Sequence, residues 1–268
     1  MRMTLKRTII YISLLLILLS APSCIYLRLL KFQKQMADFE RCFQVKEEKG
    51  LKIICLKPVL YSGDIETMLA PPTLSLVPET NPPSADNKTK QNKQWTYLFE
   101  KKYPNSYKNE KGDFDISLDM VFKDDLLNEI HLPERFLVIL PKTFLITICK
   151  TMGNAQVNKK EYSAKGAYKP PEKEANQIQI PKQNDVLKFL GNPFVWREDD
   201  INVKLNYEYR LKQKTIKPDD SVPYVWVEFT FQKTDGTLLK AEADLCGIEL
   251  SLDFAPDAKK DEKKPDNK

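Results

Sequence analysis

The sequence predicts an α+β protein made of two tandem units, each a pair of helices followed by an antiparallel sheet. Three observations support this fold class. Apolar residues three and four positions apart indicate amphipathic helices. Strict alternation of apolar and polar residues indicates strands with one buried and one wet face. The same order of helix and strands occurs twice, clearly over residues 185–254 and more weakly over residues 64–130.

An export or anchor segment precedes the two units. Its first seven residues include Arg2, Lys6 and Arg7, residues 9–19 are almost entirely apolar, and small residues follow up to Cys24. This order of charge, apolar run and small residues is typical of a secretory signal. We therefore predict that residues 1–28 form a signal peptide or membrane anchor.

Three fates of this segment are open. The stretch Ala21-Pro22-Ser23-Cys24 looks like a degenerate bacterial lipobox, in which Cys24 is the lipidation candidate. Ordinary cleavage after Ser23 would release the protein. An uncleaved span from Ile9 to Leu30 has about the 20 residues that a bilayer requires, although Pro22 and Arg28 interrupt it. Lipidation and the uncleaved span both tether the body outside the cytoplasm.

The first predicted unit covers residues 29–132 and begins with a helix that Gly50 ends. One apolar stripe defines this helix: Leu29, Phe32, Met36, Phe39 and Phe43. We expect the stripe to pack on the unit's own sheet. A position on the membrane surface is the alternative, because basic residues flank the stripe near the anchor.

A short strand, a short helix and three longer strands follow in the first unit. The strand is expected at 51–55 and the helix at 64–72, with Ser62 or Asp64 as its cap. A Pro-rich loop is expected over residues 72–94. The three strands are predicted at 95–103, 114–122 and 126–130.

The second predicted unit covers residues 133–256. Its leading helix has an apolar stripe from Leu137 to Met152, with Pro141 at its start or at a kink. A Lys-rich loop is expected over 154–184, a short helix over 185–193, and a charged connection over 196–200. Four strands are predicted at 203–211, 225–231, 238–245 and 247–254, with a tight turn at Asp235-Gly236. The charged tail, residues 257–268, is predicted to be disordered.

The second unit resembles the SmpA/OmlA (BamE-like) envelope lipoprotein fold. The resemblance depends on Val186-Leu187-Lys188-Phe189-Leu190-Gly191-Asn192-Pro193, Tyr207-Glu208-Tyr209, Val227-Glu228-Phe229-Thr230-Phe231 and Asp235-Gly236. It implies a small envelope lipoprotein, of the kind that serves the outer-membrane β-barrel assembly machinery. The first unit departs from the pattern, with Ala70-Pro71-Pro72 where the motif has Gly-x-Pro. A tandem pair also resembles, more weakly, the two-repeat β-lactamase inhibitor protein, which binds an enzyme with its sheets.

The composition argues against several classes of chemistry. The net charge is only +5 and basic residues are interspersed with acidic ones, so no basic stripe indicates nucleic acid. The chain has no phosphate loop and no nucleophile or zinc motif. His131 is the only histidine, and a surface or capping role is expected for it. Carboxylate pairs at Asp119, Asp124, Asp125, Asp199 and Asp200 are expected to be solvated. We therefore predict no enzyme, no cofactor and no metal site.

Five cysteines are present, and lipidation of Cys24 would leave four. An even number is compatible with disulfides outside the cytoplasm. Cys42 and Cys55 are the disulfide candidates, because one lies on the first helix and the other on the next strand. Four buried free thiols are the alternative.

Together these features predict a non-catalytic, membrane-anchored protein of the bacterial cell envelope, outside the cytoplasm. Its expected partners are the membrane, through the N-terminal segment, and another envelope protein, in outer-membrane assembly or maintenance. The alternative is a secreted or tethered inhibitor or ligand-binding protein with a concave surface formed by both sheets.

Overall fold

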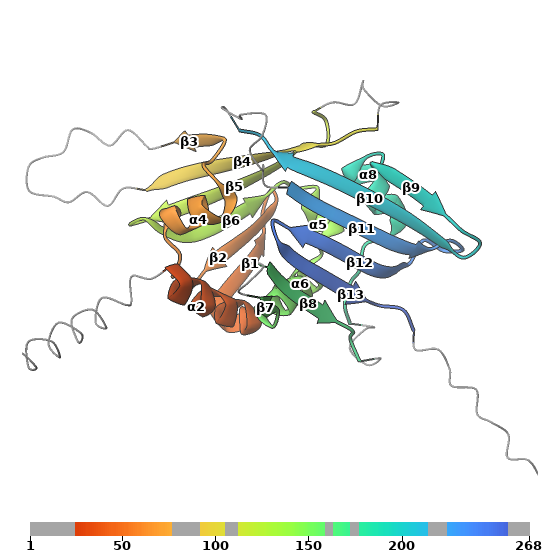
Figure 1. The fold of residues 1–268 in the computed structure, drawn as a ribbon, viewed down its shortest axis with the longest axis horizontal. Coiled ribbons are helices and arrows are strands. Elements are labelled where there is room, and N and C mark those ends of the chain that lie inside the picture. Colours follow the sequence, from red (N-terminus) through yellow and green to blue (C-terminus); the bar gives the residue numbers. More distant parts are fainter. Residues whose placement is uncertain are drawn as a thin grey trace, which may run out of the picture.

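The computed structural model describes residues 25–76, 92–104, 112–158, 163–171, 177–213 and 224–256 (Figure 1). Residues 1–24 of the predicted signal or anchor, including the lipobox with Cys24, most of the Pro-rich loop and the charged tail lie outside these residues, whereas residues 25–28 belong to the first described helix.

Thirteen strands in the described ranges form one sheet, with the order β1-β2-β6-β5-β4-β10-β11-β12-β13-β8-β7. β3 pairs with β4 and β9 with β10, beside this path. All pairs are antiparallel except β8 with β13. The strands are β1 (Phe43–Glu47), β2 (Leu51–Cys55), β3 (Leu74–Leu76), β4 (Lys93–Lys101), β5 (Ile116–Lys123), β6 (Leu126–Leu132), β7 (Gln156–Asn158), β8 (Ser163–Tyr168), β9 (Val195–Glu198), β10 (Asn202–Leu211), β11 (Tyr224–Gln232), β12 (Leu238–Leu245) and β13 (Ile248–Asp253).

Six helices accompany the sheet in the described part of the chain. They are α2 (Ile25–Ala37), α3 (Phe39–Cys42), α4 (Ser62–Leu69), α5 (Phe136–Ile139), α6 (Lys142–Gly153) and α8 (Gln183–Leu190). The α+β class is therefore confirmed. The expectation of one sheet per unit is wrong, because a single continuous sheet contains the strands of both.

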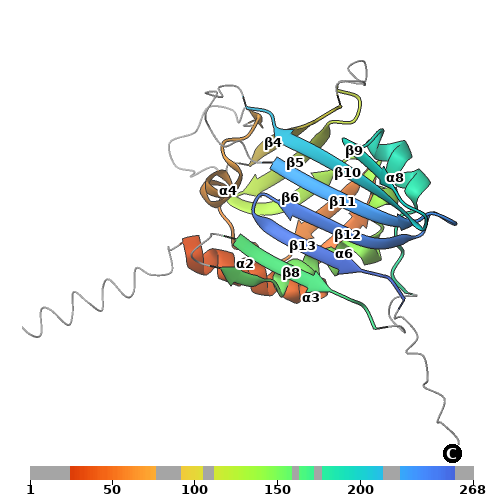
Figure 2. The same cartoon turned by 45° about the vertical axis from the view of Figure 1, so that its right-hand side comes forward.

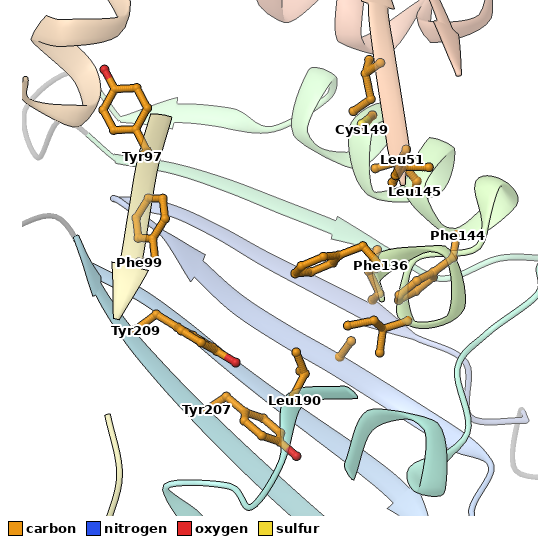
Figure 3. Packing of buried hydrophobic residues seen from close by; sticks show 14 of the residues in the cluster. Leu51, Tyr97, Phe99, Phe136, Phe144, Leu145, Cys149, Leu190, Tyr207 and Tyr209 are labelled. Atoms are coloured by element: carbon orange, nitrogen blue, oxygen red, sulfur yellow. The ribbon is translucent and has the colours of Figure 1, made fainter. Parts of the chain in front are cut away.

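The two halves of the sheet meet where β4 pairs with β10. Three residue pairs form this ladder: Lys101 with Tyr209, Glu100 with Arg210, and Phe99 with Leu211. Both strands have a buried face of alternating apolar residues, so joining them extends one core across the molecule. Figure 3 shows Tyr97, Phe99, Tyr207 and Tyr209 from these strands on the face that also receives Leu190.

The helix predicted over residues 29–49 is wrong in its second half. α2 ends at Ala37, α3 at Cys42, and the chain then enters β1. β1 forms a hairpin with β2, so tertiary pairing overrides the helical spacing. Gly50 lies in this hairpin turn at φ 135°, and a Cβ there would be 2.5 Å from the Leu132 carbonyl oxygen. It is a turn glycine rather than a helix end.

Three segments predicted as irregular contain short strands. β7 and β8 lie in the expected 154–184 loop, β9 in the charged connection, and β3 in the Pro-rich loop. Each is short, and each obtains its backbone hydrogen bonds by pairing with a neighbouring strand. β3 and β9 are almost entirely exposed, so the sequence shows no alternation of buried and polar residues from which they could be predicted.

The short helices α4 and α8 end in the same way. Tyr97 donates from its hydroxyl to the Ala70 carbonyl at 3.1 Å after α4, and Tyr207 donates to the Gly191 carbonyl at 3.0 Å after α8. Both end residues have positive φ, 70° at Ala70 and 69° at Gly191. With ψ near 180°, this conformation favours glycine. Ala70 therefore holds a strained version of the turn that Gly191 makes without strain.

We expect reciprocal substitutions at these two positions to have opposite effects on stability. Ala70→Gly should raise the free energy of unfolding by about 1 kcal/mol, because relief of strain exceeds the added flexibility of the unfolded chain. Gly191→Ala should lower it by more, since its Cβ would lie 2.6 Å from the Phe114 ring. Urea unfolding measures both, and destabilisation by Ala70→Gly would contradict the strain.

Candidate functional site

The candidate site is a hollow of about 860 Å³ over β7, β8 and β11–β13. Phe229 on β11, Ala241 on β12 and Leu250 on β13 are buried and point toward the core. Because side chains alternate along a strand, the residues next to each of these point outward. Figure 2 shows this outward face of β11–β13 and β8 turned to the viewer, with α6 behind the strands. The hollow therefore lies on the side of the sheet opposite α6.

Aromatic and charged side chains line the hollow. The cross-strand register places Trp226 opposite Asp244, Asp244 opposite Glu249, and Glu249 opposite Lys165. Lys165 pairs with Glu249 at 2.9 Å, and the Tyr224 hydroxyl donates to Asp244 at 3.1 Å. The hydrogen bond to the Asp244 carboxylate raises the pKa of Tyr224. The charged groups of the hollow are therefore spread over β12, β13 and β8.

The hollow was not predicted from the sequence. Two of its strands, β7 and β8, lie in the segment expected to be a loop. In the predicted fold, no strand therefore lay beside β13 to complete the hollow. The available signal was the alternation of the predicted strands, which places Trp226, Glu228, Glu242 and Asp244 together on the wet face.

All residues that line the hollow follow residue 153. The alternative prediction, a concave binding surface formed by both sheets, requires exposed aromatic residues from both units. On the first half, the corresponding outward face carries an ionic cluster around Glu129. Lys52 and His131 each lie 2.9 Å from this carboxylate. Although partial burial opposes it, these hydrogen bonds lower the pKa of Glu129 to about 2.

Three of the five carboxylates singled out in the sequence have the following partners in the structure. Asp119 lies opposite His131 in the ladder and accepts from the Thr96 hydroxyl at 2.5 Å. Asp125 accepts from the Ser62 hydroxyl at 2.6 Å, and Asp199 accepts from the backbone N–H groups of the turn before β10. Among the described residues, no group of three or more His, Cys, Asp or Glu is arranged to hold a metal ion.

Helix α2 is locked to the body by a nearly buried ion pair. Arg28 donates from Nε and Nη2 to the two carboxylate oxygens of Asp64, at 2.7 and 2.6 Å. The Asp64 side chain is only 4% exposed, and it also accepts from the Tyr61 backbone N–H at 2.9 Å. The Arg28 hydrogen bonds lower the pKa of Asp64. Asp64 therefore holds α2 and stabilises the first turn of α4, but the prediction of Ser62 or Asp64 as the cap is wrong, because α4 begins at Ser62 and its cap is Tyr61.

The apolar stripe of α2 packs on the protein's own core, as expected. Leu29, Phe32 and Met36 contact the core, and Phe32 meets Phe43 edge to face at 5.9 Å. A Cβ at Gly153 would collide with the Ala37 backbone, so α6 and α2 approach closely. None of the helices in the described ranges has the length and apolar character to span a membrane.

Cys42, Cys55 and Cys149 are buried free thiols, and Cys246 is a partly exposed one. The register pairs Cys55 with Phe43, so Cys42 and Cys55 are not directly opposite. Burial raises the pKa of Cys55 and of Cys149 to about 12. The disulfide predicted between Cys42 and Cys55 is not formed in the structure, whereas Cys24 lies outside the described residues.

Comparison of this chain with protein-family models, with curated proteins and with solved structures finds no match. The resemblance to the BamE-like fold therefore stays a prediction.

Removing the α2 lock should destabilise the protein in a pH-dependent way. We expect Arg28→Met to lower the free energy of unfolding by about 3 kcal/mol at pH 7, because a buried carboxylate loses its partner. The pKa of Asp64 is lower in the folded protein than in the unfolded chain, so its ionised form stabilises the fold at pH values above the ordinary pKa of a carboxyl group. This stabilisation is lost as the pH falls through the folded-state pKa. Urea unfolding between pH 7 and 3 should show the difference between variant and wild type shrinking below about pH 4.

The matched control for this prediction is Arg41→Met. Arg41 pairs with Asp38 at 3.4 Å, but both side chains are exposed, so a change under about 1 kcal/mol is expected. Equal effects of the two substitutions would contradict the role given to Arg28.

The thiols should be protected in the folded protein. The thiolate is the reactive form, so Cys55 and Cys149 should resist iodoacetamide at pH 8 and react once urea unfolds the chain. Mass spectrometry of the alkylated protein, without reductant, should find all four thiols from Cys42 to Cys246 modified in urea. Modification of Cys42 and Cys55 only after reduction would show that they form the predicted disulfide.

Proposed function

We propose that this chain is a non-catalytic, membrane-tethered protein of the bacterial cell envelope that binds another protein. The supporting observation is the hollowed outward face of the sheet, which presents Tyr224 and Trp226 among charged groups. Aromatic residues are enriched where proteins bind one another. Outer-membrane assembly or maintenance is the proposed setting, through the resemblance of residues 185–254 to the BamE-like fold.

The repeated order of elements supports two tandem BamE-like units. Before each of the helices α4 and α8 lies a helix followed by a hairpin, α2 with β1–β2 and α6 with β7–β8. After each lies a short strand and then a meander. In this proposal residues 29–132 and 133–256 are the two units, fused into one sheet through β4 and β10.

The tether comes from residues 1–28, with Cys24 as the proposed lipidation site. Arg28 and Leu29 belong to the folded body, so an anchor at Cys24 would hold that body directly at the membrane.

Crosslinking in native membranes tests this function. The full chain, expressed from its own promoter with a C-terminal tag, should sediment with membranes and enrich a specific envelope protein after crosslinking and pulldown. Intact mass of the extracted protein should show a diacyl or triacyl adduct on Cys24. Cys24→Ala is the matched variant, and it should lose the adduct. Recovery of the chain in the soluble fraction would overturn the tether, and recovery of no specific partner would overturn the binding role.

A further inference from the structure

We infer that the folded body lies on the membrane with the outer side of α2, which contacts the headgroups of anionic phospholipids. The inference rests on the proposed function, since it assumes the tether and specifies how the body lies against the bilayer. Three observations support it: the exposed residues of α2 and of the loop beside it, the charge of this surface, and its place in the chain next to the anchor.

The outer side of α2 carries exposed residues of two kinds. The apolar stripe of this helix packs on the core, so the opposite side faces outward. Tyr26 and Leu27 are exposed in its first turn, Leu27 by 47%, and Lys31 and Lys34 are exposed further along. Positions 27, 31 and 34 are four and three residues apart and therefore share one face. Apolar and aromatic residues next to lysines are typical of a helix at a membrane interface.

The loop between β2 and α4 widens this surface. It runs along α2, because Gln35 donates to the Lys57 carbonyl at 2.8 Å and the Arg28 guanidinium lies 5.1 Å from the centre of the Tyr61 ring. Leu56, Lys57 and Tyr61 of this loop are exposed, Leu56 by 51%. Figures 1 and 2 both show α2 on the outside of the molecule, with α4 above its first turns. We call these exposed residues of α2 and of the loop the α2 surface.

The α2 surface is basic. α2 contains Arg28, Lys31 and Lys34 and no acidic residue. Arg28 is held by Asp64, whereas Lys31 and Lys34 take part in no ion pair within the part of the chain that the structure describes. Lys57 adds a third exposed ammonium group. Basic residues close to an anchor are attracted to the anionic lipids of a membrane surface. The charge of the α2 surface therefore complements that of an anionic bilayer.

The place of α2 in the chain brings this surface to the membrane. Only Ile25 lies between Cys24 and Tyr26, so their Cα atoms are at most about 7 Å apart. The proposed lipid on Cys24 would hold Tyr26 and Leu27 at the headgroup boundary, where tyrosine is enriched in membrane proteins. Because the tether keeps lipid headgroups at a high effective concentration, individually weak contacts of the lysines are sufficient.

Fluorescence quenching on vesicles tests this orientation. The full chain carries a dansyl amino acid at position 27, 38 or 201 and is reconstituted through its own N-terminal segment. The vesicles are phosphatidylcholine with or without phosphatidylglycerol, and a nitroxide on the lipid headgroup quenches nearby dansyl groups. Asp38 is exposed and continues the face of Leu27 just after α2. Ile201 is 68% exposed before β10, at the right-hand end in Figure 1, whereas α2 begins at the left. In anionic vesicles we expect quenching at 27 and 38 and none at 201.

Matched variants test the role of the lysines. Two lysines near an anionic surface favour contact by about 30-fold, so Lys31→Gln/Lys34→Gln should lose most of the quenching at position 38. Its thermal unfolding temperature should stay that of the wild type, because both side chains are exposed. Lys188→Gln/Lys233→Gln makes the same change in net charge at exposed positions of α8 and of the turn after β11, and it should leave the quenching unchanged. Equal effects of the two double variants would contradict the inference.

Flotation of the same vesicles separates this inference from the proposed function. A chain that floats with the vesicles, but is quenched no more at position 38 than at 201, would overturn the orientation and leave the tether standing. A chain that does not float would overturn both. A benzophenone amino acid at position 38 gives a second measurement in native membranes, where lipid adducts are expected. Adducts with another protein or with a second copy of this chain, in place of lipid, would assign the α2 surface to a protein partner and overturn the inference.

Discussion

The short ladder between β4 and β10 is the contact on which the rest of the structure depends. It has three residue pairs, and Lys101 at its end is 5% exposed. Its ammonium group donates to the Leu190 carbonyl at the end of α8, and the Phe114 and Tyr207 rings lie 4.9 and 5.3 Å from it. A cation in the interior is costly unless such partners surround it. Lys101 therefore links β4 to the helix that covers β10.

Joining the halves through this ladder gives the sheet two different faces. The inner face buries Trp95, Tyr97 and Phe99 of β4 and Tyr207 and Tyr209 of β10 beneath the helices. The outer face is free to vary in charge, because its residues contribute little to the core. On the first half it carries an ionic cluster around Glu129, and on the second half, near Trp226, Glu242 pairs with Lys240 and Glu249 with Lys165.

Much of this fold was predictable from period-two alternation, which located the long strands β4, β5 and β10–β13. The parts that failed depend on partners distant in sequence. Phe39 and Phe43 continue the helical spacing of the apolar stripe on α2. Phe43 nevertheless lies in a strand, because it pairs with β2 in a hairpin. β8 has little apolar character, and it is a strand because β13 pairs with it. The hollow could not be predicted, because two of its strands, β7 and β8, lie in a segment that was expected to be a loop. The buried face of Trp95, Tyr97 and Phe99 was predicted correctly, because alternation alone defines it.

The ion pair between Arg28 and Asp64 also limits how far the folded body could move relative to an anchor at Cys24. Only residues 25–27 separate Cys24 from Arg28, and they already belong to α2. A lipid on Cys24 would therefore leave almost no flexible tether, so the body would keep a narrow range of orientations to the bilayer. Such a restriction would keep the outward face of β11–β13 within a thin layer above the membrane, and under the proposed function only partners that reach this layer would meet that face at high effective concentration.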